Sequence, residues 1–306
     1  MARIDSTASV ETLVRDAAEG RDDEFDFGGF EEDFDDHDHD EYYLSGCHSH
    51  YPAIVPLRGC LAGDPHGRRT VALLGDSKAA QWFYALDAAV AERGWRLASY
   101  TKAGCPPLPL LRFHYPRTPD GVFPECEEWQ RLLLWRLREE PPHTAVLSYH
   151  HEGYVHRTGR ALLDAEWQDS LRGIVLQLRT LGVQQAVLLL DTPLPEFDIP
   201  DCLRHCGRDF RRCAVPRHRA LDMQTRTALA EEAAALSVPV IDPADWFCTP
   251  GAATVPEGGA FDATAAAGGV CPAVVGGIMV YRDGRHVSTR YTRLLARSLA
   301  DALPRA

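Results

Sequence analysis

The sequence has 306 residues, of which 45% are hydrophobic and 25% are charged, and its formal net charge is −12. These values are ordinary for a soluble globular protein, and no apolar run approaches the roughly 18 residues of a membrane helix. Residues 21–41 hold twelve acidic side chains and one basic side chain, a charge of −11, which leaves −1 for the rest. Without a basic excess in the remainder, we expect no nucleic acid partner.

The N-terminal part of the chain predicts a linker. The stretch "RDDEFDFGGFEEDFDDHDHDE" is like-charged and of low complexity, so it repels itself and stays extended. We expect residues 1–46 to form an acidic disordered linker and residues 47–306 to form one domain. Residues 36–41 contain metal-binding residue types, but a solvated linker is the better interpretation, and we expect no metal site. The first residues lack the apolar core of a secretion signal.

From residue 70 onwards, apolar runs alternate with amphipathic segments. The predicted strands are "TVALLG", "WRLASYT", "TAVLSYH", "QAVLLLD", "VPVID" and a last strand in "GGIMVYRD". The predicted helices cover residues 79–93, 125–138, 162–181, 217–236 and 288–302. Alternating strands and helices with near-continuous apolar strands are typical of a parallel sheet covered on both faces. The sequence therefore predicts an α/β fold, a three-layer α/β/α sandwich around a five-stranded, mainly parallel sheet.

The nine cysteines fall in loop-like segments and form no CxxC pair. A zinc cluster around "CLRHC" has a spacing that fits no common zinc finger, so pairing between near neighbours is the better interpretation. It joins Cys47 to Cys60, Cys105 to Cys126, Cys248 to Cys271, and Cys213 to either Cys202 or Cys206, with one cysteine left over. Disulfides indicate an oxidising compartment, which conflicts with the missing secretion signal.

A serine occupies the junction between the first predicted strand and its helix, in "LLGDSKAAQW". Ligands of parallel sheets bind beyond the carboxyl ends of the strands. The residues expected at this rim are Ser77, Lys102, Gly104, His150, His151 and Asp191. A backbone N–H at the start of a helix can stabilise an oxyanion, although a serine in this place is also a common helix N-cap.

The second feature is the D-x-x-H spacing of Asp283 and His286, just before the last predicted helix. A serine nucleophile needs a base, and the base needs a group that orients it. This pair can supply both, and it follows the last predicted strand. The alternative is a surface turn with a solvated histidine.

Together, "LLGDSKAAQWFYAL", "TKAGCPP", "CAVPR" and "YRDGRHVSTRYTRLL" resemble the SGNH/GDSL hydrolase superfamily. They resemble most closely the SGNH domain fused to the C-terminus of acyltransferase-3 membrane proteins, from about Cys47 to the C-terminus. The resemblance implies Ser77 as nucleophile, His286 as base, Asp283 as its orienting group and Gly104 as an oxyanion donor. Gln81 matches the glutamine of the family's first block and joins the expected substrate-binding residues.

The sequence departs from the family pattern in three ways. It contains no asparagine, so the superfamily's asparagine oxyanion donor is absent; either His150, His151 or a backbone N–H replaces it, or the oxyanion hole has two donors. Lys78 stands where a histidine usually follows the nucleophile. We expect it, with Lys102 on the same rim, to neutralise negative charge at the site; the alternative is a solvated side chain.

The third departure is the missing membrane half. The resemblance therefore implies a membrane acyltransferase partner that is encoded separately or missing from this chain. It also implies a location on the extracytoplasmic face of the membrane or in the cell envelope, which would explain the cysteines.

These observations predict serine-dependent acyl transfer through an acyl-serine. The expected donor is an acyl ester, and the acceptor is a carbohydrate hydroxyl of a cell-surface glycan or water, which makes the protein an O-acyltransferase or an esterase. No cofactor is expected. The alternative is a catalytically impaired module that binds a glycan or an acyl carrier.

Overall fold

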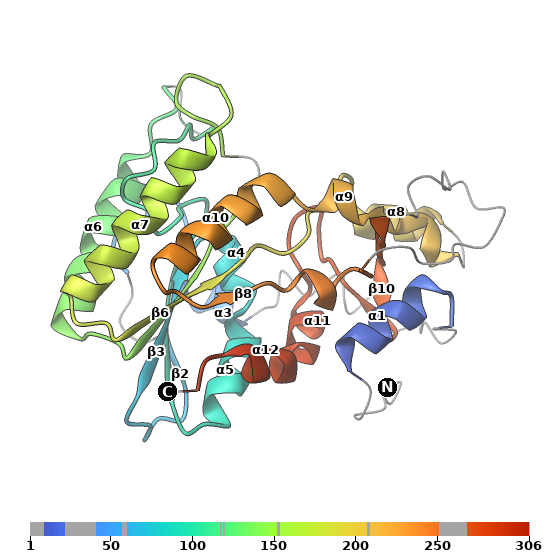
Figure 1. Cartoon of the computed structure of the whole chain (residues 1–306), viewed down its shortest axis with the longest axis horizontal. Helices are drawn as coiled ribbons and strands as arrows, with labels where there is room; N and C mark the ends of the chain where they lie inside the picture. Colours follow the sequence, from blue (N-terminus) through green and yellow to red (C-terminus); the bar gives the residue numbers. More distant parts are fainter. Residues whose placement is uncertain are drawn as a thin grey trace. The chain divides into compact units, whose positions relative to one another are not determined.

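The structure is a computed structural model, coloured along the chain in Figure 1. It describes residues 9–21, 41–56, 60–116, 118, 120–151, 154–206, 209–250 and 268–305. The chain divides into two compact units. The sheet unit comprises Glu41–Asp191, Met223–Ile241 and Leu299–Ala306, and the second unit comprises Met1–Asp40, Thr192–Asp222 and Asp242–Ser298. Each unit is described by itself.

A seven-stranded sheet forms the centre of the sheet unit. Its strand order is β1-β4-β3-β5-β6-β8, with β2 paired to β4. The strands are β1 (His48–Ser49), β2 (Leu61–Gly63), β3 (Thr70–Gly75), β4 (Arg96–Lys102), β5 (Thr144–Ser148), β6 (Gln185–Leu189) and β8 (Val240–Ile241). Only β2 runs antiparallel to its neighbour. The five strands predicted from residues 70–242 are confirmed, and β1 and β2 extend the sheet at one edge.

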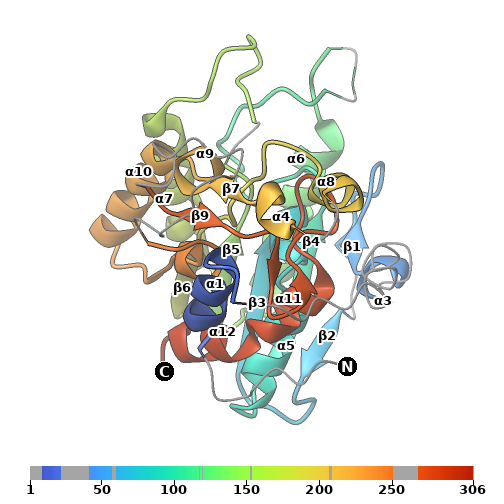
Figure 2. The ribbon, with the colours of Figure 1, turned by 90° about the vertical axis from the view of Figure 1, so that its right-hand side faces the viewer.

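Helices cover both faces of this sheet. One face packs against α6 (Pro124–Glu139), α7 (Asp164–Thr180) and α10 (Met223–Ala235), with Ala72, Leu74, Ala145 and Leu147 in the shared core. Successive side chains of a strand point to opposite faces, so Leu73 and Val146 face the other side. There α5 (Phe83–Ala91) contacts β2 and β4 (Figure 2). The predicted α/β/α arrangement with a mainly parallel sheet is confirmed.

The remaining elements of the sheet unit are short. They are α3 (Glu41–Leu44), α4 (Ser77–Ala80) and the end of α12 (Ala296–Ala302). The Arg93 guanidinium donates hydrogen bonds to the carbonyl oxygens of Pro304, at 2.8 Å, of Leu303, at 2.9 Å, and of Ala300. These bonds hold the C-terminal segment on the sheet unit.

The second unit is built from short elements. They are α1 (Val10–Ala18), α8 (Ile199–His205), η2 (Phe210–Cys213), β7 (Val215–Pro216), α9 (Arg217–Ala220), η3 (Ala244–Trp246), β9 (Val270–Cys271), β10 (Val274–Val275), β11 (Ile278–Met279) and α11 (Thr289–Leu294). The last predicted strand differs from our expectation, because β11 pairs antiparallel with β10 in a separate two-stranded sheet. Gly276 and Gly277, with φ of 58° and 69°, form the two-residue turn that this hairpin requires.

Four disulfides confirm the pairing of near neighbours. They join Cys47 to Cys60 and Cys105 to Cys126 in the sheet unit, and Cys202 to Cys213 and Cys248 to Cys271 in the second unit. Cys206 is the cysteine outside these four disulfides, and it is buried. The alternative of a Cys206–Cys213 bridge is thereby removed.

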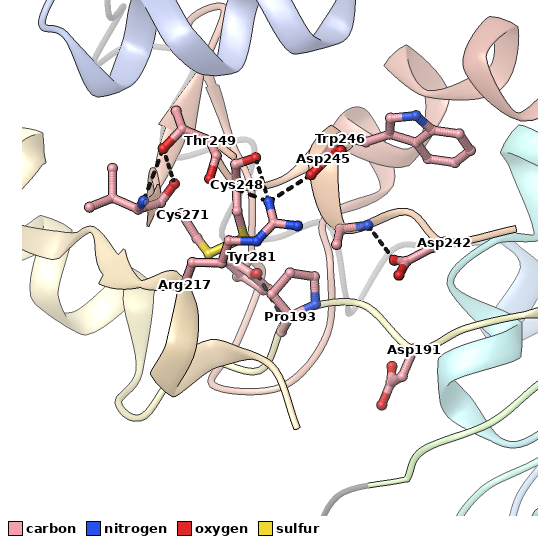
Figure 3. The surroundings of a disulfide bond; sticks show 12 residues. Asp191, Pro193, Arg217, Asp242, Asp245, Trp246, Cys248, Thr249, Cys271 and Tyr281 are labelled. Atoms are coloured by element: carbon pink, nitrogen blue, oxygen red, sulfur yellow. Dashed lines mark hydrogen bonds and ion pairs between the residues drawn. A yellow bond between two sulfur atoms is a disulfide. The ribbon is translucent and has the colours of Figure 1, made fainter. Parts of the chain in front are cut away.

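The Cys248–Cys271 bridge lies in a hydrogen-bonded part of the second unit (Figure 3). The Arg217 guanidinium donates to Asp245 Oδ1 at 2.7 Å and to the carbonyl oxygens of Cys248 and Thr249 at 3.2 and 3.3 Å. The Tyr281 hydroxyl donates to the carbonyl oxygen of Pro193 at 3.0 Å. These contacts and the disulfide stabilise a unit with little regular structure.

Two helices, α1 and α3, lie in the described residues of the predicted linker. Helix α1 begins after Ser9, whose side chain accepts a hydrogen bond from the Thr12 N–H, and it contacts β9, β10 and η3. Its apolar face buries Val10, Val14 and Ala17, which is why this part of residues 1–46 differs from the expected disorder. The acidic residues 22–40 lie outside the described residues, and the linker boundary at residue 46 stays a prediction. No helix in the described part of the chain is long and apolar enough to cross a membrane.

Candidate active site

The serine of the strand–helix junction lies where the sequence predicts it, between β3 and α4. The two strands β3 and β5 end together, with Gly75 paired to Ser148. A Cβ atom on Gly75 would clash with the carbonyl oxygen of Ser148 and with the Ala79 side chain. Only glycine therefore allows the close approach that places Ser77 at the first position of α4, beside the end of β5.

Asp76 holds this junction together. Its Oδ1 caps α4 by accepting the Lys78 N–H at 2.8 Å, and its Oδ2 accepts the His150 N–H at 3.0 Å and the Tyr154 hydroxyl at 2.9 Å. Burial raises the pKa of Asp76, although the charge interaction with His150 and the hydrogen bonds from the His150 and Lys78 backbone N–H groups act in the opposite direction. Burial also raises the pKa of Tyr154 well above its usual value, so its hydroxyl stays a donor.

Lys78 is buried and forms an ion pair. Its side chain is 2% exposed, and its Nζ lies 3.4 Å from Asp191 Oδ1. Burial alone would raise the pKa of Asp191, but the Lys78 ammonium and the hydrogen bond from His150 hold it below its usual range. The solvated lysine considered from the sequence is therefore wrong, and the environment favours a role in fixing Asp191 over direct contact with substrate.

The two histidines after β5 both engage Asp191. His150 Nδ1 lies 2.8 Å from Asp191 Oδ2. His151 is buried, and its Nε2 accepts the Asp191 N–H at 3.1 Å. Because His151 Nε2 is an acceptor, it carries no hydrogen in this arrangement and cannot donate to an oxyanion.

The other predicted binding residues have different surroundings. Gly104 adopts φ of 63° in the turn after β4, and its N–H has no hydrogen-bond partner among the described residues, which suits the predicted oxyanion donor. Gln81 is buried at the end of α4.

Lys102, the second lysine, is fully buried. Its Nζ donates to the carbonyl oxygen of Ala53 at 2.6 Å and lies 5.3 Å from the centre of the Phe123 ring. Burial lowers the pKa of Lys102 to about 8. These contacts favour a structural role for Lys102 over the predicted role in neutralising substrate charge.

Asp283 and His286 belong to the second unit and form a hydrogen-bonded dyad. Asp283 Oδ2 lies 2.8 Å from His286 Nδ1, and Oδ1 accepts the backbone N–H groups of Arg285 and His286, each at 2.6 Å. Burial opposes ionisation of Asp283, but these hydrogen bonds, led by that from the His286 ring, lower its pKa. The carboxylate therefore fixes the hydrogen on Nδ1 and leaves Nε2 of a neutral His286 as the proton acceptor.

Sequence reasoning placed Asp191 on the rim but gave it no function, and it missed Tyr154 and Arg226. The Arg226 guanidinium donates to the Asp191 carbonyl oxygen at 2.6 Å. The signal that could have found the role of Asp191 was its position at the end of the strand next to β5. No local sequence feature marks Tyr154 or Arg226. Among the described residues, no group of three or more His, Cys, Asp or Glu side chains can hold a metal ion.

The fold and the site define a class of protein, an α/β domain with a serine at the β3–α4 junction and an Asp–His dyad on a turn. The sequence model of the family described as "SGNH domain (fused to AT3 domains)" matches residues 46–261. This match covers most of the chain, which therefore belongs to the SGNH domain family. Membership supports acyl transfer or ester hydrolysis as the class of chemistry.

One solved structure shows the same fold, and a second has a lower similarity. The periplasmic domain of a lipopolysaccharide acetyltransferase from Salmonella ser. Paratyphi A superposes with a TM-score of 0.56 at 13% identity, over 78% of this chain and 84% of that one. An aryl esterase from M. smegmatis has a TM-score of 0.43 at 12% identity, over 76% and 97% of the two chains. No curated protein matches the sequence.

Proposed function

We propose that this domain transfers an acyl group from an ester donor through an acyl-serine on Ser77. The observation that carries the proposal is the Asp283–His286 dyad, with its 2.8 Å contact between Oδ2 and Nδ1. An ionised carboxylate at Nδ1 orients the imidazole and stabilises the imidazolium that forms when Nε2 takes a proton. Such a dyad in a family defined by its serine chemistry indicates a general base.

In the proposed reaction, Ser77 Oγ attacks the ester carbonyl while His286 Nε2 takes the hydroxyl proton. The N–H groups of Ser77, at the positive end of α4, and of Gly104 stabilise the oxyanion. The intermediate collapses to acyl-Ser77, and His286 returns its proton to the leaving alcohol. An acceptor hydroxyl then attacks the acyl carbon, its proton passes to His286 and from there to Ser77, and the free serine is restored.

For the acceptor, we propose a hydroxyl group of a cell-surface carbohydrate, with water as the competing acceptor. The family description, which names fusion to AT3 domains, and the likeness to the lipopolysaccharide acetyltransferase domain support this choice. They also support a membrane acyltransferase as partner, on the same polypeptide or a separate one. Four disulfides support an extracytoplasmic location.

A second candidate is a module that binds a glycan or an acyl carrier without turnover. The complete absence of asparagine favours it, because loss of one oxyanion donor lowers the rate by about 10²–10³. The intact Asp–His dyad favours the enzyme.

The test uses the purified chain with p-nitrophenyl acetate and a fluorophosphonate probe. We expect ester hydrolysis and labelling by the wild type, loss of both in Ser77→Ala, and retention of both in the control Ser298→Ala on α12. Addition of a carbohydrate should divert the acyl group to an acylated sugar that mass spectrometry detects. Equal labelling of the wild type and Ser77→Ala would refute the proposal, and a wild type that binds glycan without turnover would favour the second candidate.

A further inference from the structure

A groove lies between the C-terminal halves of α6 and α7, which are neighbours in the sheet unit (Figure 1). Its volume is about 500 Å³, which is within the range of small-molecule sites. We call it the α6–α7 groove, and its lining includes Arg131, Leu134, Trp135, Arg138, Leu176 and Gln177.

The α6–α7 groove is separate from the candidate active site. Helix α6 leads into β5 and α7 leads into β6, and a helix between parallel strands runs opposite to them. The C-terminal halves of both helices therefore lie near the edge of the sheet where the strands begin. Ser77 follows the other end of β3, and six strand residues span about 20 Å.

The groove exposes large apolar side chains. Of the six tryptophans in the sequence, Trp135 is the one that is exposed, with half of its surface open to solvent. Leu176, on the facing helix, is 49% exposed. The Arg136 guanidinium lies over the Trp135 ring, 5.5 Å from its centre, and helps to hold the indole in place. Apolar side chains that gather in a groove with a polar rim are typical of a binding site.

Gln177 brings a buried hydrogen-bonding atom without a partner to this groove. Its Oε1 is buried and accepts no hydrogen bond from any described residue, whereas buried polar atoms almost always have a partner. A ligand in the groove can supply the missing donor. A hydroxyl group suits either orientation of the amide, because it both donates and accepts. An alkyl chain has no donor, so Gln177 disfavours a lipid chain as the occupant.

The charge of the groove favours an acidic ligand. Among the described residues that line it, two are arginines and none is acidic. Arg131 is engaged by Glu128, at 2.6 and 2.8 Å. The Arg138 guanidinium forms no hydrogen bond or ion pair within the described part of the chain. Its planar fork of N–H donors matches the two oxygens of a carboxylate.

We propose that the α6–α7 groove binds an acidic oligosaccharide. A sugar ring offers an apolar C–H face to the Trp135 indole, hydroxyl groups to Gln177 and, in a uronic acid, a carboxylate to Arg138. The proposal rests on the proposed function only for the source of the ligand, the cell-surface glycan. A glycan held about 20 Å from Ser77 is tethered near the nucleophile, which raises the effective concentration of its other hydroxyl groups.

The experiment measures binding in the Ser77→Ala chain, so that chemistry plays no part. The probe is the hexasaccharide of galacturonic acid, titrated by calorimetry, and the neutral maltohexaose is the comparison. We expect the acidic hexasaccharide to bind more tightly than the neutral one. Trp135→Ala, Gln177→Ala and Arg138→Gln should each weaken its binding by about tenfold or more.

Two matched variants outside the groove are the controls. Leu163→Ala removes an apolar side chain that is 57% exposed, and Arg68→Gln removes an exposed arginine. Both should leave binding unchanged. Circular dichroism and urea midpoints check that the groove variants fold like the parent chain.

Several results would overturn the proposal. They are no binding of the acidic hexasaccharide, equal affinity for maltohexaose, or binding that the three groove variants leave unchanged. A dimer that Trp135→Ala dissociates in light scattering would identify a second copy as the occupant. Binding to phosphatidylglycerol vesicles in place of the hexasaccharide would identify a lipid surface.

The proposed acyl transfer can fail or hold independently of this site. Hydrolysis of p-nitrophenyl acetate needs Ser77 and not the groove, so Trp135→Ala in the otherwise wild-type chain should keep its kcat/KM. An inactive wild type that still binds the hexasaccharide would refute the acyl-serine and retain the groove. An active wild type without binding would do the reverse.

Discussion

Replacing Lys78 by methionine keeps the length of the side chain and removes its charge. Lys78 and Asp191 are 2% and 3% exposed, and their charged groups lie 3.4 Å apart. The substitution therefore leaves a buried carboxylate without its cation, which costs about 3–5 kcal/mol. With a urea m-value of about 3 kcal/mol/M, the unfolding midpoint should fall by about 1 M or more. Urea titrations followed by tryptophan fluorescence measure this change.

A double-mutant cycle tests the reason for the loss. Asp191→Asn keeps an acceptor for His150 but removes the buried charge, so Lys78→Met combined with Asp191→Asn should be more stable than the sum of the two losses predicts. Arg131→Met, which removes an exposed partner of Glu128, is the control and should change the midpoint little. An unchanged midpoint in Lys78→Met, or additive losses, would show that Lys78 is not the counter-ion of Asp191.

Three further predictions concern stability. Gly75→Ala should prevent folding or lower the urea midpoint strongly, because its Cβ would clash with the backbone of β5, whereas Gly268→Ala meets only ordinary contacts and should be tolerated; normal stability of Gly75→Ala would contradict the close packing. Deletion of residues 1–20 should lower the melting temperature by several degrees, because it uncovers the surface that Val10, Val14 and Ala17 bury. Val14→Asp should do the same and the exposed Arg15→Gln should not; an unchanged melting temperature would restore the linker interpretation. Asp191 and Asp283 have pKa values below the usual range, so their stabilisation is complete above about pH 5 and is lost as the pH falls through the region below about pH 4. Urea midpoints measured from about pH 5 downwards, through the region below about pH 4, should therefore decline less steeply for Asp283→Asn than for the wild type, and equal slopes would contradict the assignment.

The main sheet could be predicted because its signal is local. Continuous apolar runs such as Val71–Leu74 define strands buried on both faces, and the helices between them force parallel pairing. The short strands β1 and β2 have no such run and exist because β4 offers them an edge. The β10–β11 hairpin was predictable from its Gly276–Gly277 turn, a signal that the apolar run over residues 278–281 obscured.

The residues of the candidate site also divide into those that the sequence alone can predict and those that it cannot. Ser77, Asp283 and His286 stand in local motifs, so the sequence alone is enough to propose them as site residues. The partners of Lys78 depend on which strand lies next to β5, and the sequence supplies no local sign of that contact. Asp191, which lies 41 residues after His150 in the sequence, comes next to it only when β6 pairs with β5. An ion pair between distant strand ends is a property of the assembled sheet.

The burial of both lysines has a chemical consequence. The sequence holds only these two lysines, and both are enclosed within the sheet unit. An acylating reagent in solution therefore meets no lysine amine on the folded protein, so lysine acylation becomes a direct readout of unfolding. The proposed acyl transfer would therefore leave the lysines of the folded domain unmodified, and the exposed basic side chains are arginines, which stay protonated and are poor nucleophiles.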